Sequence, residues 1–216
     1  MHTCNLTTAT YAETGQVVWP AAVVLSHYLL HHSHLVQSRS VLELGAGVGL
    51  PGLVAAKLTK DPSAVVLTDH TEVVLELLQK NTEANFTGDT VQPPDGPKSA
   101  LLDWGVDLEE FRMTYGTFDL ILGADIIYWI EQEGMAEPLF QTVSMLMSKK
   151  ADAMFVMCHH VRSAQIAQSI QDIAGKFNLL CAEVGKDDLP AVCSDSLSNV
   201  PLQLLTFTPK DADIIV

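Results

Sequence analysis

The amino-acid sequence predicts a doubly wound α/β fold, in which helices cover both faces of a mainly parallel seven-stranded β-sheet. Two observations carry this prediction. Short apolar runs alternate along the chain with stretches of helical periodicity. Runs such as 65–67 and 120–122 are apolar at every position, which indicates strands that are buried on both faces between layers of helices.

The expected strands are short, and most are separated by a helical pattern. They are predicted at 41–44, 64–68, 99–102, 118–124, 153–158, 179–184 and 202–207. Helices are predicted from Pro20, a residue suited to a first helical turn, and over 50–58, 71–85, 135–147 and 163–177. No helical pattern separates the last two strands, so we expect a hairpin that gives the sheet an antiparallel edge. The segment 86–97 holds three prolines and two glycines and is predicted as a flexible loop.

Length and charge restrict the function. The 216 residues suit one domain over 1–216, with 1–18 as an N-terminal extension. A net charge of −14 with scattered basic residues argues against nucleic acid as a partner and suits a basic protein. No run approaches the ~20 apolar residues of a membrane span, and no signal peptide is evident. We expect a monomer in the cytoplasm, with the nucleus as a second location.

A glycine-rich loop follows the first predicted strand. Ligands of such sheets bind beyond the carboxyl ends of the strands, and the segment 43–49 at that position reads ELGAGVG. Alternate glycines let the backbone approach a ligand closely. A dinucleotide-binding loop has the spacing G-x-G-x-x-G, whereas here Leu50 occupies the place of the last glycine. Together with Glu43, this pattern favours a cofactor that lacks a pyrophosphate and has a cationic amino-acid end.

Three further residues follow strand ends, and each has a functional and a structural interpretation. Asp69 either accepts hydrogen bonds from both hydroxyls of a ribose or is a helix N-cap or turn residue. Trp104 either flanks an adenine ring or belongs to the core, and Asp125 either faces the cleft or is a buried structural aspartate. No metal site is predicted, because positive charge is favourable near a helix C-terminus and this explains the helically spaced His27, His31 and His34.

Together these residues resemble the family 16 protein methyltransferases, a branch of the seven-strand S-adenosylmethionine-dependent class, over roughly residues 13–162. The matching segments are Gly15 to Trp19, Val41 to Gly52, Asp69, Asn81 with Asn85, 102–105 and the D-x-x-Y motif from Asp125 to Tyr128. The resemblance implies S-adenosylmethionine as cofactor. It implies that the cofactor is held by Trp19, Glu43, Gly45, Ala46, Gly47, Asp69, Trp104 and Ala124, and that Asp125 and Tyr128 face the acceptor.

The activity implied by the resemblance is methyl transfer to a protein side-chain nitrogen, most often that of lysine. Asp125 is expected to orient the acceptor amine, and Tyr128 to line the channel or contact the cation. Three alternatives stay open: a small-molecule, nicotinamide-like N-methyltransferase, a catalytically silent binding protein, and arginine methylation. The last arises because segment 19–22 looks most like a subgroup that includes a histone-arginine methylating enzyme. The segments 86–97 and 186–199 depart from the family pattern and are candidates for substrate choice.

Overall fold

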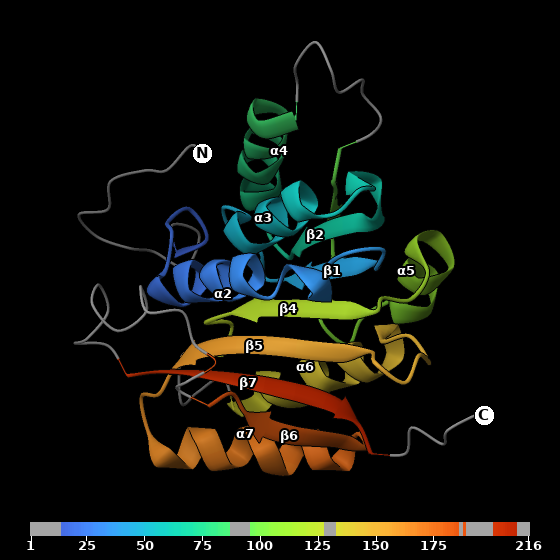
Figure 1. Cartoon of the computed structure of the whole chain (residues 1–216). Helices are drawn as coiled ribbons and strands as arrows, with labels where there is room; N and C mark the ends of the chain where they lie inside the picture. The colour runs from blue at the N-terminus through green and yellow to red at the C-terminus, as the bar shows by residue number, and fades with distance from the viewer. Residues whose placement is uncertain (1–13, 87–95, 128–132, 186–187, 189–200, 211–216) are drawn as a thin grey trace.

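The computed structural model describes residues 14–86, 96–127, 133–185, 188 and 201–210. Its strands form one sheet (Figure 1). They are β1 (Val41–Leu44), β2 (Val65–Asp69), β3 (Lys98–Leu101), β4 (Leu120–Ala124), β5 (Met154–His160), β6 (Leu179–Glu183) and β7 (Leu202–Pro209). The order across the sheet is β3-β2-β1-β4-β5-β7-β6, with β1 to β5 parallel.

Helices cover both faces of this sheet, as predicted. They are α2 (Pro20–His31), α3 (Leu50–Leu58), α4 (Glu72–Phe86), α5 (Leu108–Tyr115), α6 (Glu133–Leu146) and α7 (Ala164–Lys176), with short 3-10 helices at Ser33–Leu35 and Pro62–Ala64. One apolar core lies between the sheet and α2, α3 and α4. A second core lies between the opposite face and α5, α6 and α7. None of the helices in the described ranges is long and apolar enough to cross a membrane.

The alternation of side chains along β1 explains how the sheet serves both cores. Leu42 and Leu44 pack in the core under α5, α6 and α7, whereas Val41 packs in the core under α2, α3 and α4. Glu43 lies between the two leucines, so its side chain is directed to the same face as Val41, toward α3. All four residues are buried, and this buried carboxylate is the polar exception in an apolar strand.

The C-terminal strands pair as the predicted hairpin, with one detail that the sequence did not reveal. β7 is antiparallel to both β5 and β6, so it lies inside the sheet and β6 forms the edge. The structure also contains α5, which the sequence analysis did not predict. Its two buried residues, Leu108 and Phe111, form one short apolar face on an otherwise polar segment.

Candidate functional site

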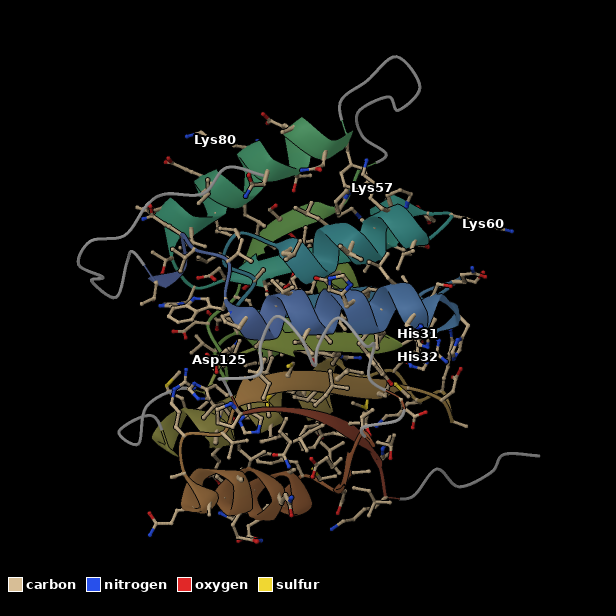
Figure 2. All side chains as sticks on the ribbon, turned by 60° about the vertical axis from the view of Figure 1, so that its left-hand side comes forward. His31, His32, Lys57, Lys60, Lys80 and Asp125 are labelled. Carbon is tan, nitrogen blue, oxygen red and sulfur yellow. The ribbon has the colours of Figure 1, made fainter. Side chains whose placement is uncertain are left out.

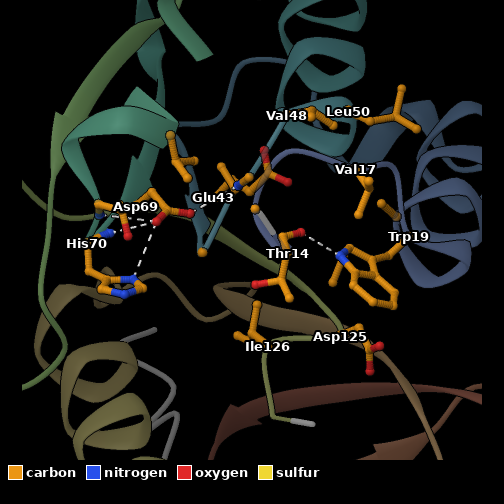
Figure 3. Close-up of a pocket in the computed structure, with 18 of the residues that line it drawn as sticks. Thr14, Val17, Trp19, Glu43, Val48, Leu50, Asp69, His70, Asp125 and Ile126 are labelled. Carbon is orange, nitrogen blue, oxygen red and sulfur yellow. Dashed lines mark hydrogen bonds and ion pairs between the residues drawn. The ribbon is translucent and has the colours of Figure 1, made fainter. Parts of the chain in front are cut away.

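A cavity lies at the carboxyl ends of β1, β2 and β4, where the strand order changes direction between β1 and β4 (Figure 3). Every predicted cofactor residue lines it: Trp19, Glu43, Gly45, Ala46, Gly47, Asp69, Trp104 and Ala124. Asp125 lines it as well. Tyr128, the other predicted acceptor residue, lies outside the described residues. Figure 3 shows Asp69 and His70 on one side of the cavity and Asp125 on the other, below Trp19.

The backbone of the glycine loop is hydrogen-bonded to the end of β2. Ala46 donates a hydrogen bond to the Thr68 carbonyl at 2.8 Å, and the Gly47 amide donates to Asp69 Oδ2 at 3.1 Å. Gly47 has a φ of +53°, and a Cβ atom there would lie 3.0 Å from the Gly15 carbonyl oxygen. Only glycine meets both conditions without strain, so the loop presents bare backbone to the cavity.

Glu43 combines a buried carboxylate with a backbone partner in the next helix. Its Oε2 accepts a hydrogen bond from the Gly52 amide at 2.9 Å, and the residue is 1% exposed. Burial raises the pKa of Glu43 to about 8; the Gly52 hydrogen bond opposes this rise, and the negative charge of Asp69 adds to it. The pocket therefore holds a carboxyl group whose ionised form is costly until a cation accompanies it.

Gly52 is the contact that keeps Glu43 in place, and we expect Gly52→Ala to destabilise the protein. A Cβ atom there would lie 2.0 Å from Leu67 Cδ2 and 2.5 Å from Glu43 Oε2. Overpacking of this kind costs about 1–3 kcal/mol, which a urea unfolding curve would measure. Gly134→Ala is the matched control, because no atom of the described residues lies within 4 Å of a Cβ at that helical glycine. If both variants unfold at the same urea concentration as wild type, Gly52 does not pack closely against Leu67 and Glu43, and this prediction is contradicted.

Asp69 serves the local backbone and also faces the cavity. Its Oδ1 accepts hydrogen bonds from the amides of His70 at 2.9 Å and Thr71 at 3.3 Å, just before α4 begins. Both amides precede α4, so Asp69 stabilises the turn before the helix and does not cap it. Its position at the cavity is the one that the ribose interpretation requires. His70, which the sequence analysis did not single out, lies with Nδ1 3.4 Å from Asp69 Oδ1. Its hydrogen bond to Asp69 raises the pKa of His70.

Asp125 forms a two-pronged ion pair that the sequence analysis did not foresee. Its Oδ1 accepts from Arg162 Nη1 at 2.8 Å, and its Oδ2 accepts from Arg162 Nη2 at 2.6 Å. The His160 amide donates a third hydrogen bond to Oδ1 at 3.1 Å. Asp125 also has a φ of +54°, a left-handed conformation that few residues other than glycine adopt. Arg162 also lines the cavity. Its position in the sequence did not indicate that it pairs with Asp125.

Part of the cavity wall comes from the segment before α2. Thr14, Gly15 and Val17 line it, although the sequence analysis gave 1–18 no firm structure. The Trp19 indole donates a hydrogen bond to the Thr14 carbonyl at 2.9 Å and is 38% exposed. In the sequence, the one indication that this segment belongs to the site was the family resemblance from Gly15 to Trp19. Trp104 is half-buried and packs against the core, and it also lines the cavity.

The chemistry of the lining suits a cationic ligand. Four carboxyl groups line the cavity, at Glu43, Asp69, Asp103 and Asp125, and Arg162 pairs with one of them. A glycine loop that presents backbone and an apolar wall complete the site. Among the residues that the structure describes, no group of three or more histidines, cysteines or carboxylates is placed to hold a metal ion. The residues present therefore fit S-adenosylmethionine, which carries a sulfonium, an ammonium and a ribose.

Comparisons with known proteins agree with this interpretation. The chain is 44% identical over 137 residues to the protein N-lysine methyltransferase METTL21A of Mus musculus, an alignment that covers 62% of this chain and 56% of the relative. It is 34% identical over 170 residues to the histone-arginine methyltransferase METTL23 of Xenopus laevis, which covers 79% of this chain and 67% of the relative. The match to METTL21A thus spans little more than half of that protein.

The fold is also that of known methyltransferases. The magnesium protoporphyrin IX methyltransferase of Synechocystis PCC 6803, solved with bound S-adenosylmethionine, superposes with a TM-score of 0.56 at 13% identity; the match covers 95% of this chain and 86% of that one. A family model described as lysine methyltransferase matches residues 2–175. The protein therefore belongs to the lysine methyltransferase family and has the fold and the cofactor of the S-adenosylmethionine-dependent methyltransferases.

Proposed function

We propose that this protein transfers the methyl group of S-adenosylmethionine to the side-chain amine of a lysine in a protein acceptor. The observation that carries the proposal is the lysine methyltransferase family match over residues 2–175. The 44% identity to a protein N-lysine methyltransferase supports the same acceptor. The acidic surface implied by the net charge of −14 suits a basic protein partner.

The cavity divides into a cofactor part and an acceptor part in this proposal. S-adenosylmethionine supplies a methyl group already activated by its sulfonium. Asp69 would accept hydrogen bonds from the ribose hydroxyls, and Glu43 would offset positive charge at the amino-acid end. Trp104 would flank the adenine. The glycine loop allows close approach of the cofactor, so the chain's main task is alignment rather than proton transfer.

The acceptor part lies around Asp125, on the side of the cavity opposite Asp69 (Figure 3). Trp19 lies above Asp125 in Figure 3 and is 38% exposed, so its indole forms an apolar part of the opening on this side. An apolar opening suits the aliphatic stem of lysine. Asp125 would accept a hydrogen bond from the amine, direct its lone pair and offset the positive charge that develops on the nitrogen.

The test is to incubate the purified protein with methyl-labelled S-adenosylmethionine and an unlabelled cell extract, and then to separate proteins from small molecules. We expect label in one or a few protein bands, and no label with Asp125→Ala. Label confined to the small-molecule fraction would contradict the proposal and indicate a nicotinamide-like N-methyltransferase. Cofactor binding without any transfer would indicate a silent binding protein.

Arginine is the second candidate acceptor. The relative METTL23 of Xenopus laevis is a histone-arginine methyltransferase, and its match covers 79% of this chain, against 62% for METTL21A. Hydrolysis of a labelled band to amino acids separates the two candidates, since methyllysine and methylarginine have different retention times.

Asp69→Ala should weaken cofactor binding about tenfold or more, because a hydrogen bond to a charged group contributes about 1.5–3 kcal/mol. The variant also leaves three backbone amides without their acceptor, so Asp69→Asn, which retains one carbonyl oxygen, is measured beside it. Titration calorimetry gives the dissociation constant, and exposed Glu76→Gln is the control. A large loss of turnover at saturating cofactor would count against the ribose role of Asp69.

A further inference from the structure

The ion pair between Asp125 and Arg162 occupies most of the carboxylate that the acceptor amine must meet. Three N–H groups already donate to its two oxygens, two from Arg162 and one from the His160 backbone. The Asp125 side chain is 5% exposed and that of Arg162 is 28% exposed. The guanidinium therefore lies on the more open side of the pair, and the carboxylate is held in one orientation with little accepting capacity left.

This arrangement has a consequence for the protonation of a lysine acceptor. A lysine amine has a reference pKa of about 10.4 and must lose its proton before it can attack. An unpaired carboxylate within 4–6 Å of that amine would favour the charged ammonium and so oppose the reaction. The Arg162 guanidinium donates to both oxygens at hydrogen-bond distance, so its positive charge offsets part of the negative charge of Asp125.

Other ionisable groups near the pair do not replace Arg162. His159 and His160 lie on β5, and the pKa of His159 is lowered mainly by burial, with a hydrogen bond to Gln203 that opposes this effect. Gln203 in turn donates to Glu183 on β6. The other ionisable groups that line the cavity are Glu43, Asp69, His70 and Asp103.

Several other basic residues are separated from Asp125 by the fold. Figure 2 shows His31 and His32 at the far end of α2 from Asp125, and Lys57, Lys60 and Lys80 away from it on the α3 and α4 side. Among the residues that the structure describes, Arg162 is thus the one arginine or lysine that lines the cavity.

We infer that Arg162 is a positioning residue for methyl transfer. It fixes both oxygens of Asp125 and offsets part of its negative charge, so that Asp125 orients a lysine amine without holding that amine in its protonated form. This inference rests on the proposed lysine methyltransferase activity. It assigns two separable effects to one side chain. The fork geometry orients the carboxylate, and the charge lowers the pH at which the bound acceptor reacts.

The test compares wild type, Arg162→Gln and Arg162→Lys, with Arg112→Gln as a matched control. Arg112 pairs with Glu109 on the exposed surface of α5, away from the cavity. The acceptor probe is the protein band that the wild-type enzyme labels in the cell extract, purified. Turnover is measured against pH at saturating probe and cofactor, because this profile reports ionisations in the bound complex. Melting temperature and cofactor affinity are measured for each variant to show that the site is still folded.

We expect the acidic limb of the Arg162→Gln profile to move to higher pH by about one unit. Arg162→Lys keeps the charge but not the fork, so its limb should stay near that of wild type while its maximum turnover falls. Arg112→Gln should match wild type. If Arg162→Gln lowers turnover by the same factor at every pH and its acidic limb stays at the wild-type pH, the inference is overturned and the proposed function is left intact. The absence of any labelled protein with the wild type, or label on arginine, would overturn both.

Discussion

Glu43→Gln is expected to stabilise the ligand-free protein and to weaken its binding of S-adenosylmethionine. Glu43 is 1% exposed, and its pKa is raised to about 8, chiefly by burial. In the unfolded chain the same carboxyl ionises near pH 4.5. The folded state therefore binds the proton more tightly. The resulting contribution to stability is complete below about pH 4.5 and is lost progressively up to about pH 8.

A glutamine at this position does not ionise, so the stability of the variant does not fall between pH 4.5 and pH 8 for this reason. Its carbonyl oxygen can still accept the Gly52 amide hydrogen bond. At pH 7 the free energy of unfolding of Glu43→Gln should exceed that of wild type by on the order of 3 kcal/mol. Calorimetric melting without ligand measures the gain, which should shrink as the pH falls toward 5.

Glu43→Gln should weaken cofactor binding although it stabilises the free protein, since a neutral glutamine cannot offset the positive charge of the cofactor. We expect the dissociation constant for S-adenosylmethionine to rise at least tenfold, because charge-assisted hydrogen bonds are about twice as strong as neutral ones. Glu76→Gln, at an exposed position of α4, should change neither property. A variant that melts below wild type at pH 8, or that binds the cofactor as tightly as wild type, would contradict the role assigned to Glu43.

Asp125→Asn should lower turnover by about 100-fold and change cofactor affinity little. Asparagine keeps the shape of the side chain but can pair with only one prong of Arg162, and it cannot offset charge on the methylated nitrogen. Removal of one preorganised electrostatic partner of a transition state costs about 100- to 1,000-fold in other enzymes. Single-turnover rates and calorimetric titration separate the two effects.

Asp119→Asn is the matched control for this variant. Asp119 is also buried and also forms an ion pair, with Lys150 at 2.7 Å, but it precedes β4 at the opposite end of the strand from the cavity. We expect it to lower the melting temperature without slowing transfer by the folded protein. Full transfer activity of Asp125→Asn with unchanged cofactor binding would show that Asp125 does not orient the acceptor.

Much of the fold was predictable because the central strands are buried on both faces and are therefore almost entirely apolar, with polar residues such as Glu43 and Asp69 at or near their carboxyl ends. The edges were less predictable. The short apolar face of α5, Leu108 with Phe111, is too small to register as a helical period, and no local pattern shows that β7 lies between β5 and β6. Pairings between strands that are distant in sequence depend on the whole sheet rather than on any one segment.

The site was predictable as a set of positions but not as a set of contacts. Strand ends placed Glu43, Asp69 and Asp125 around one cavity, because parallel strands bring their carboxyl ends to the same edge. The partners of these carboxylates come from other elements, as with Gly52 in α3 and Arg162 after β5. Arg162 is separated from Asp125 by 37 residues, and an ion pair at that separation leaves no mark in the sequence pattern.

The central claim, methyl transfer to a lysine of a protein, is tested most directly by the chemical identity of the labelled residue. Protein bands labelled from methyl-labelled S-adenosylmethionine are excised, hydrolysed to amino acids and separated against methylated standards, with Asp125→Asn run in parallel. We predict that the label elutes with methyllysine and is nearly absent from the variant. Label that elutes with methylarginine, or label that never enters the protein fraction, would contradict the account.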